Sequence, residues 1–175
     1  MSDRIYNVLF LCTGNSARSI LGEALLNHVG AGRFRAFSAG STPKGSVHPL
    51  TLETLATAGI AIDGLRSKSW EEFAVPGAPV MDFVFTVCDN AANEACPIWP
   101  GQPMTAHWGL EDPAAVEGTD FQRRAAFAAT LRYLRNRIGA FVNLPLASID
   151  RMALNSRLEG IGAMDGTTTK SSNVA

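Results

Sequence analysis

Short apolar runs alternate along this chain with longer stretches whose apolar residues recur at helical spacing. Each apolar run is bounded by glycine, proline or polar residues, which is typical of a buried strand. Four such runs are present, at Tyr6–Leu11, Phe34–Ser38, Met81–Cys88 and Met104–Trp108. We therefore predict four strands.

The intervening stretches predict helices. Ser19–Val29 carries apolar residues at helical spacing and is followed by Gly30, a common stop signal. The other predicted helices are Pro49–Ala58, Phe121–Val142 and one beyond Pro145. This alternation of strand and helix predicts a three-layer α/β/α fold with a four-stranded parallel sheet and helices on both faces.

The chain has 175 residues, of which 46% are hydrophobic and 18% charged, and this fits one compact unit. We divide it into an α/β domain at residues 1–144, which contains every candidate site residue, and a C-terminal helix with a flexible tail at 145–175. The tail "DGTTTKSSNVA" is mostly small and polar. We therefore expect it to be disordered.

The charge and the N-terminus exclude several classes of partner. Net charge is −1, with 15 basic and 16 acidic residues, so nothing favours binding to nucleic acid or to an anionic membrane. The apolar run in "MSDRIYNVLFLCTG" is too short for a signal peptide or a membrane span. We expect a cytoplasmic protein, in which three cysteines are more often catalytic, redox-active or buried than disulfide-bonded.

The stretch "YNVLFLCTGNSARS" places Cys12 where the first strand ends. The loop after it leads into a helix, so its N–H groups can turn inward and bind an anion, helped by the helix dipole. Gly14 allows backbone conformations closed to other residues, and Arg18 offers a planar fork for two oxygens of an oxyanion. The predicted oxyanion-binding residues are Thr13, Gly14, Asn15, Ser16, Ala17, Arg18 and Ser19.

The same environment would act on the sulfur of Cys12. Because cysteines at helix N-termini can have pKa values of about 3.5–7.5, we expect Cys12 to be largely ionised at neutral pH and to act as a nucleophile. A lone cysteine is more often buried and structural, but Cys-x5-Arg-Ser between a strand and a helix favours chemistry. Neither a Walker nor a Rossmann glycine motif is present.

The motif "CTGNSARS", with a later "EDP", resembles the low-molecular-weight protein tyrosine phosphatase superfamily. The chain is more closely similar to the arsenate reductases of that fold, which thioredoxin regenerates. The matching segments lie between residues 6 and 143 and read "LFLCTGNSARS", "FSAG", "FTVCDNAANEACP", "HWGLEDPA" and "FQRRAAF".

The resemblance implies a mechanism and its residues. Cys12 would attack arsenate while Asp112 protonates the departing oxygen. Cys88 would then form a disulfide with Cys12 as arsenite leaves, and Cys96 would move that disulfide outward by attacking Cys88. The segment Asp89–Ala95 would have to move, and its composition suits local unfolding. The resemblance implies no bound cofactor but an external thiol reductant, either thioredoxin or glutaredoxin with glutathione.

Two other functions compete with arsenate reduction. A phosphatase would use Cys12, Arg18 and Asp112 on phosphomonoesters. For an arsenate reductase, phosphate and sulfate would be analogues of the arsenate substrate. Phosphatases of this fold tend to have tyrosines after the Asp-Pro, whereas this chain has Ala114 and Ala115. A non-enzymatic redox sensor that binds oxyanions would need no general acid.

Smaller signals complete the interpretation. Some relatives bind potassium near the loop, and Asn15, Glu23 and Ser38 match three of the four ligands, while the fourth aligns near Ser69. Asn15 and Ser19 match residues that shape the loop by hydrogen bonds. The histidines are too scattered for zinc, the arginines of the long helix at 121–142 should face solvent, and Trp108 should be core.

Overall fold

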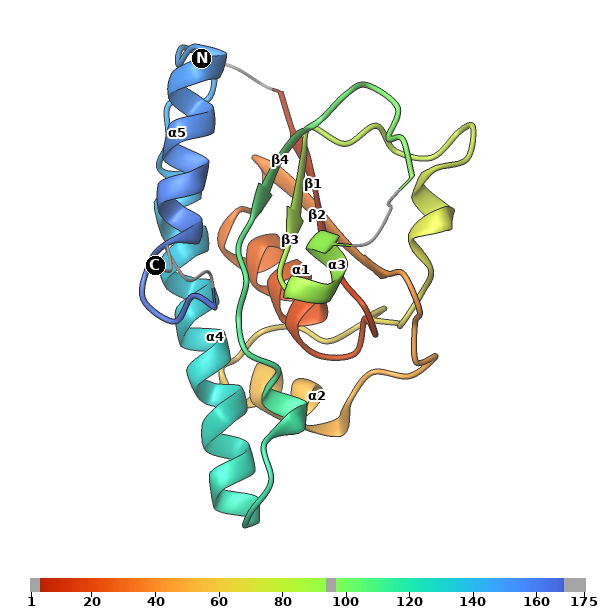
Figure 1. Ribbon diagram of the computed structural model, residues 1–175, viewed down its shortest axis with the longest axis vertical. Coiled ribbons are helices and arrows are strands. Elements are labelled where there is room, and N and C mark those ends of the chain that lie inside the picture. The colour runs from red at the N-terminus through yellow and green to blue at the C-terminus, as the bar shows by residue number, and fades with distance from the viewer. Residues whose placement is uncertain (1–3, 94–96, 169–175) are drawn as a thin grey trace.

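The computed structural model describes residues 4–93 and 97–168, and its centre is one parallel sheet. The strands lie side by side in the order β2-β1-β3-β4 (Figure 1). Their bounds are β1 Tyr6–Cys12, β2 Phe34–Gly40, β3 Phe83–Thr86 and β4 Met104–His107. The predicted four-stranded parallel sheet is therefore confirmed, although β3 is shorter than the predicted strand Met81–Cys88.

Five helices and two 3-10 turns surround the sheet in the described part of the chain. They are α1 Arg18–Val29, α2 Pro49–Thr57, α3 Asp89–Asn93, α4 Asp120–Val142, α5 Arg151–Gly162, and the turns η1 Trp70–Phe73 and η2 Pro113–Ala115. Helix α4 starts at a capping box in which Thr119 and Gln122 bond each other's backbone N–H groups. The sequence patterns did not predict α3, because its five residues carry no apolar periodicity.

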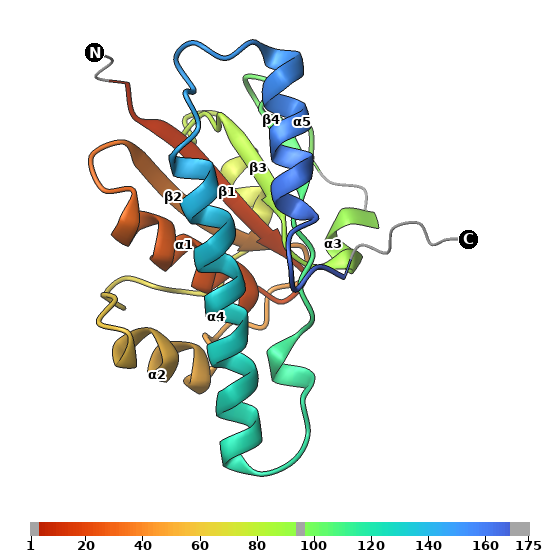
Figure 2. The ribbon, with the colours of Figure 1, turned by 90° about the vertical axis from the view of Figure 1, so that its left-hand side faces the viewer.

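The two faces of the sheet are covered unequally. Helices α1, α4 and α5 pack on one face, where Figure 2 shows α4 and α5 in front of the strands. There Trp108 is fully buried and stacks on Phe85, with ring centroids 3.9 Å apart. On the other face Leu9 and Leu11 pack against Phe73 of η1 and against Trp99. This second layer is a thin one, made of a single turn and of loops.

The pairing of the two inner strands positions the candidate chemistry. Leu11 of β1 pairs with Thr86 of β3, and the Val87 N–H donates to the Leu11 carbonyl at 2.8 Å. Cys12 and Cys88 therefore follow these neighbouring strands at the same edge of the sheet. In parallel α/β sheets this carboxyl edge is where ligands bind.

The C-terminal part of the chain returns to the same edge. Helix α5 packs on β4 and α4, and the Leu158 carbonyl accepts a hydrogen bond from the Trp108 indole at 3.1 Å. Residues 165–168, predicted to belong to a flexible tail, instead follow α5 back to the sheet, where Thr167 pairs with Leu110. Residues 169–175 lie outside the described part.

One arginine of α4 also departs from the prediction. Arg137, expected on a solvated face, is fully buried and donates to the carbonyl oxygens of Met164 and Asp165. Binding of the returning C-terminal segment explains this burial, since that segment covers the inner side of the helix. Across residues 4–93 and 97–168, no helix is long and apolar enough to cross a membrane.

Candidate active site

The loop between β1 and α1 curves around the sulfur of Cys12. Its carbonyl groups point away from the sulfur: those of Thr13, Gly14 and Ser16 accept hydrogen bonds from the backbone N–H groups of Thr42, Lys44 and His48. A trans peptide directs its N–H opposite to its carbonyl. The N–H groups of residues 14, 15 and 17 therefore face the opposite side, and that of Asn15 lies 3.2 Å from Cys12 Sγ.

Asn15 gives this loop its shape. Its φ of 45° lies in the left-handed region, which costs energy for a non-glycine residue and persists where other contacts fix it. Its fully buried side chain donates to the hydroxyls of Ser19 (2.8 Å) and Ser38 (3.0 Å) and accepts from the Lys68 N–H (2.8 Å). The prediction for Gly14 was wrong in this respect, because the left-handed position of the loop is Asn15.

Cys12 is 3% exposed, and its sulfur lies 2.8 Å from the Ser19 hydroxyl. Burial raises the pKa of the Cys12 thiol, and the neighbouring Cys88 raises it further, while the Ser19 hydrogen bonds and the Arg18 charge lower it. The net direction is upward. This direction is opposite to the one expected from the loop amides and the helix N-terminus, because desolvation outweighs the donors.

Arg18 and Asp112 approach the same opening from different elements. The Arg18 guanidinium, at the start of α1, donates to the Leu110 carbonyl at 2.8 Å and lies 3.7 Å from Asp112 Oδ2. Asp112 also accepts from the Ala114 N–H and so caps η2. Arg18 thus links the anion-binding loop to the segment that carries Asp112.

Cys88 lies beside the loop. Cys88 is 2% exposed, and its sulfur is 3.6 Å from the Thr13 hydroxyl and 3.4 Å from the Ala91 N–H of α3. Thr13 of the oxyanion loop therefore contacts the second described thiol. Cys96, predicted as the third redox cysteine, lies outside the described residues.

A cavity of about 500 Å³ opens above Cys12. It contains the predicted residues Cys12 to Arg18 together with Asp112. Sequence reasoning missed four further lining residues, Thr42, Pro43, Lys44 and Asn90. The lysine was open to prediction, since "AGSTPKGS" follows a parallel strand at the edge where ligands bind. Ser19 does not line the cavity and acts through its bond to the sulfur.

The candidate potassium site is not suited to the ion. The Lys68 ammonium lies 3.7 Å from the Glu23 carboxylate and 3.5 Å from the Ser38 hydroxyl, two of the three matched ligands. Lys68 is 7% exposed. A cationic group of the chain itself therefore contacts the predicted ligands, and a potassium ion would meet its charge at close range. No group of three His, Cys, Asp or Glu side chains in residues 4–93 and 97–168 is arranged to hold a metal ion.

Three features occur together here: a parallel α/β sheet, a cysteine at the end of the inner strand β1, and a loop whose amides point inward. They are typical of enzymes that bind an oxyanion and attack it with a cysteine. The model of the low molecular weight phosphotyrosine protein phosphatase family matches residues 7–152. The chain belongs to this family.

Several relatives within the family are arsenate reductases. The arsenate reductase of Shouchella clausii (strain KSM-K16) is 35% identical over 140 residues, which are 80% of this chain and 93% of that protein. A solved arsenate reductase in its phosphate-binding state matches with a TM-score of 0.64 at 27% identity, over 79% of this chain and 97% of that one. The thioredoxin-dependent arsenate reductase of Corynebacterium glutamicum matches with a TM-score of 0.55 at 27% identity, over 79% of this chain and 64% of that one.

Proposed function

We propose that this protein is an arsenate reductase that uses three cysteines in succession. The observation that carries the proposal is the second thiol: Cys88 follows the strand next to that of Cys12 and lies against Thr13 of the oxyanion loop. Hydrolysis of a phosphate ester needs one nucleophile, whereas reduction of arsenate needs two electrons, which two thiols supply as they form a disulfide. The arsenate reductases among the relatives support the same assignment.

In the first step the Cys12 sulfur bonds to arsenic while one arsenic–oxygen bond breaks. The departing oxygen leaves as water with a proton from Asp112, and the thiol proton replaces the one that Asp112 has given. The inward N–H groups of the loop and the Arg18 guanidinium bind the remaining oxygens. Because burial favours the protonated thiol, Cys12 loses its proton in the course of the attack, and Ser19 stabilises the sulfur anion by its hydrogen bond.

In the second step the Cys88 sulfur attacks the Cys12 sulfur. The sulfur–arsenic bond breaks, and its electron pair stays on arsenic, which leaves as arsenite with the Cys88 proton. Cys96 then attacks Cys88, so that a Cys88–Cys96 disulfide forms and the Cys12 thiol is restored. An external dithiol reduces this disulfide, and we propose thioredoxin, with glutaredoxin and glutathione as the alternative. Such a cycle needs a reducing compartment, and for this reason we place it in the cytoplasm.

A phosphatase is the second candidate, since Cys12, Arg18 and Asp112 would serve it equally. What disfavours it is the turn after the acid: η2 presents Ala114 and Ala115, which offer no aromatic surface to an aryl phosphate.

The deciding experiment compares the two activities of one preparation. NADPH consumption is followed with arsenate, thioredoxin and thioredoxin reductase, and hydrolysis of an aryl phosphate is measured in parallel. We expect sustained turnover with arsenate, about one turnover per enzyme for Cys96→Ser, and none for Cys12→Ser. Multiple turnover by Cys96→Ser would refute the relay, and fast ester hydrolysis without arsenate turnover would favour the phosphatase.

A further inference from the structure

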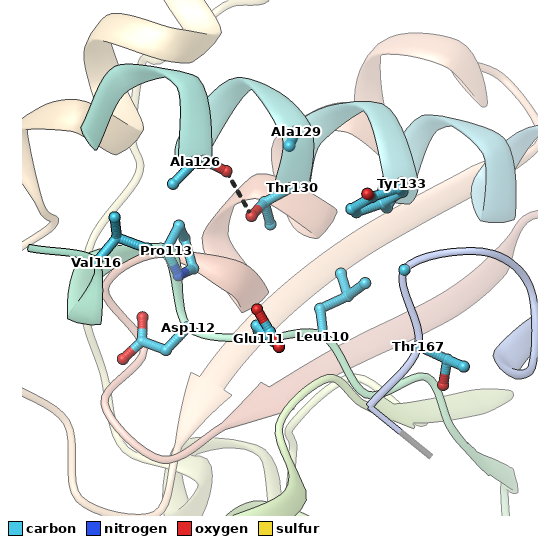
Figure 3. A pocket seen from close by; sticks show the side chains of 11 residues that line it. Leu110, Glu111, Asp112, Pro113, Val116, Ala126, Ala129, Thr130, Tyr133 and Thr167 are labelled. Atoms are coloured by element: carbon cyan, nitrogen blue, oxygen red, sulfur yellow. Dashed lines mark hydrogen bonds between the residues drawn. The ribbon is translucent and has the colours of Figure 1, made fainter. Parts of the chain in front are cut away.

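The segment that follows α5 pairs with the loop that carries Asp112. We call residues 163–168 the C-terminal clasp and residues 109–112 the acid loop. Thr167 of the clasp pairs in antiparallel fashion with Leu110, and the Thr168 N–H donates to the Gly109 carbonyl at 3.2 Å. Figure 3 shows the acid loop running alongside α4, with Thr167 near Leu110 at one end of it. The match to the family ends at residue 152, so the clasp lies beyond it.

Helix α4 holds the clasp against the rest of the protein. The fully buried guanidinium of Arg137 donates to the carbonyls of Met164 (3.0 Å) and Asp165 (3.1 Å). Gly166 lies flat on the ring of Tyr133, where a side chain would overlap the ring. If the clasp moved away, the buried guanidinium would lose these acceptors and remain desolvated, which costs free energy. The clasp therefore has one strongly preferred position.

Thr168, the last described residue of the clasp, contacts helix α3. The Thr168 hydroxyl donates to Asp89 Oδ1 at 2.8 Å, and His107 Nε2 lies 2.7 Å from the same oxygen. A carboxylate only accepts, so this ring nitrogen donates, and the ring's Nδ1 lies 2.8 Å from the Thr86 hydroxyl. A continuous chain of hydrogen bonds thus runs from Thr86 of β3 to Thr168, through the first residue of α3.

We propose that Thr168 is a positioning residue, which through Asp89 holds helix α3, and with it Cys88, against the oxyanion loop. Helix α3 has five residues, too few to be stable by itself, so its place depends on bonds to the rest of the fold. Asp89 follows Cys88 directly, and Asn90 lines the substrate cavity. The clasp therefore sets both the position of the second thiol and one wall of the cavity.

The consequence for catalysis rests on the proposed function. In the relay, Cys88 first meets Cys12 and afterwards meets Cys96, so α3 has to leave its place between the two steps. The Thr168–Asp89 bond favours the first arrangement and opposes the second. Weakening this bond should loosen α3 while leaving the sheet, Cys12 and Arg18 unchanged.

The test needs no arsenate, and so its failure is distinct from failure of the proposed function. The reduced full-length protein is treated with N-ethylmaleimide, and labelling of the Cys88 peptide is followed by mass spectrometry. Thr168→Val, which removes the hydroxyl, should label Cys88 about fivefold faster, as loss of one hydrogen bond of ordinary net strength implies. Amide exchange in residues 89–93 should accelerate similarly, with residues 83–86 unchanged.

Two matched variants separate positioning from a general loss of stability. Thr168→Ser retains the hydroxyl and should label at the wild-type rate, and Thr57→Val, an exposed position of α2, should do the same. Wild-type labelling and exchange in Thr168→Val would overturn the proposal, as would equal acceleration in Thr57→Val or no recovery in Thr168→Ser. In an arsenate-loaded protein, Thr168→Val should also form the Cys88–Cys96 disulfide faster.

Discussion

At the scale of single residues, the site depends on side chains behind the cavity. Lys68 and Glu23 form a buried ion pair, Ser38 donates to Glu23, and Asn15 connects Ser38 to Ser19 beside the nucleophile. Burial raises the pKa of the Glu23 carboxyl, and the Lys68 charge acts against that shift. A chain of hydrogen bonds therefore connects this ion pair to the sulfur of Cys12.

We expect Lys68→Met to destabilise the fold by about 3–5 kcal/mol near neutral pH, because it leaves the buried Glu23 carboxylate without its partner. Without the lysine, the folded-state pKa of Glu23 rises further above its ordinary 4.5. A group with a raised pKa is stabilising when protonated, so the deficit should be small below pH 4.5 and grow as pH rises through the folded pKa. Urea unfolding at several pH values measures it.

Potassium provides the control for this variant. Added KCl should recover part of the lost stability of Lys68→Met relative to choline chloride at equal ionic strength. The wild-type protein should have the same unfolding free energy in both salts. A wild-type protein that potassium stabilises specifically would contradict the assignment of the ammonium to this place.

Much of the site could be predicted at this scale, because its residues are adjacent in sequence. The order Cys12 to Ser19 is a local pattern, and one loop between a strand and a helix arranges it. Lys68, Asn90 and Thr168 could not be predicted, since they reach the site only through tertiary packing. The direction of the Cys12 pKa shift could not be predicted for the same reason, because the degree of burial is a property of the whole fold.

At the scale of elements, helix α2 begins on a titratable cap. His48 Nδ1 accepts from the Leu50 N–H at 3.0 Å, and its ring packs on Phe127. Burial lowers the pKa of His48, and the charges of Arg123 and Lys44 lower it further. Protonation of Nδ1 would remove the acceptor, so the cap exists only with the neutral ring.

The sign of the pH dependence follows from that direction. A histidine whose folded pKa is below its unfolded value of 6.5 contributes stability above pH 6.5 and loses it as pH falls through the folded pKa. We expect His48→Asn, which retains a capping oxygen that does not titrate, to show a shallower loss of unfolding free energy between pH 7 and 5. Equal slopes for His48→Asn and the wild-type protein would contradict this account.

The elements themselves were predicted unevenly. Strands and long helices followed from their apolar periodicity, and the predicted bounds of α1 and α4 differ from those found by one residue. Helix α3 and the short extent of β3 were not predicted, because their limits depend on pairing and on hydrogen bonds to distant residues. Local composition suggested a segment at 89–95 able to unfold, and in its first part tertiary bonds at Asp89 support the helical turn Asp89–Asn93.

At the scale of the whole molecule, the part beyond the family match contributes residues to the main hydrophobic core. Leu158 of α5 is fully buried, while Met152 on the same helix is 82% exposed. Division of the chain at residue 145 remains a prediction, but contacts from α5 to β4 and α4 join the two parts.

We expect Leu158→Ala to lower the unfolding free energy by about 2–5 kcal/mol, since it opens a cavity in the shared core. Urea unfolding should stay a single transition with an unchanged slope and an earlier midpoint. Met152→Ala should lie within about 0.5 kcal/mol of the wild-type protein. A separate early transition for Leu158→Ala would mean that α5 is an independent appendage.

The order β2-β1-β3-β4 has a consequence for how such proteins diversify. Both described thiols follow inner strands, and each inner strand is paired on both sides. The distance between the ends of these two strands is therefore fixed by the centre of the sheet and does not depend on its outer edges. Surface turns that lie away from the hydrogen-bonded residues Thr86, His107, Asp89 and Thr168 can be rebuilt without altering that distance. New chemistry can then arise by changing what surrounds these two positions, while the centre of the scaffold stays the same.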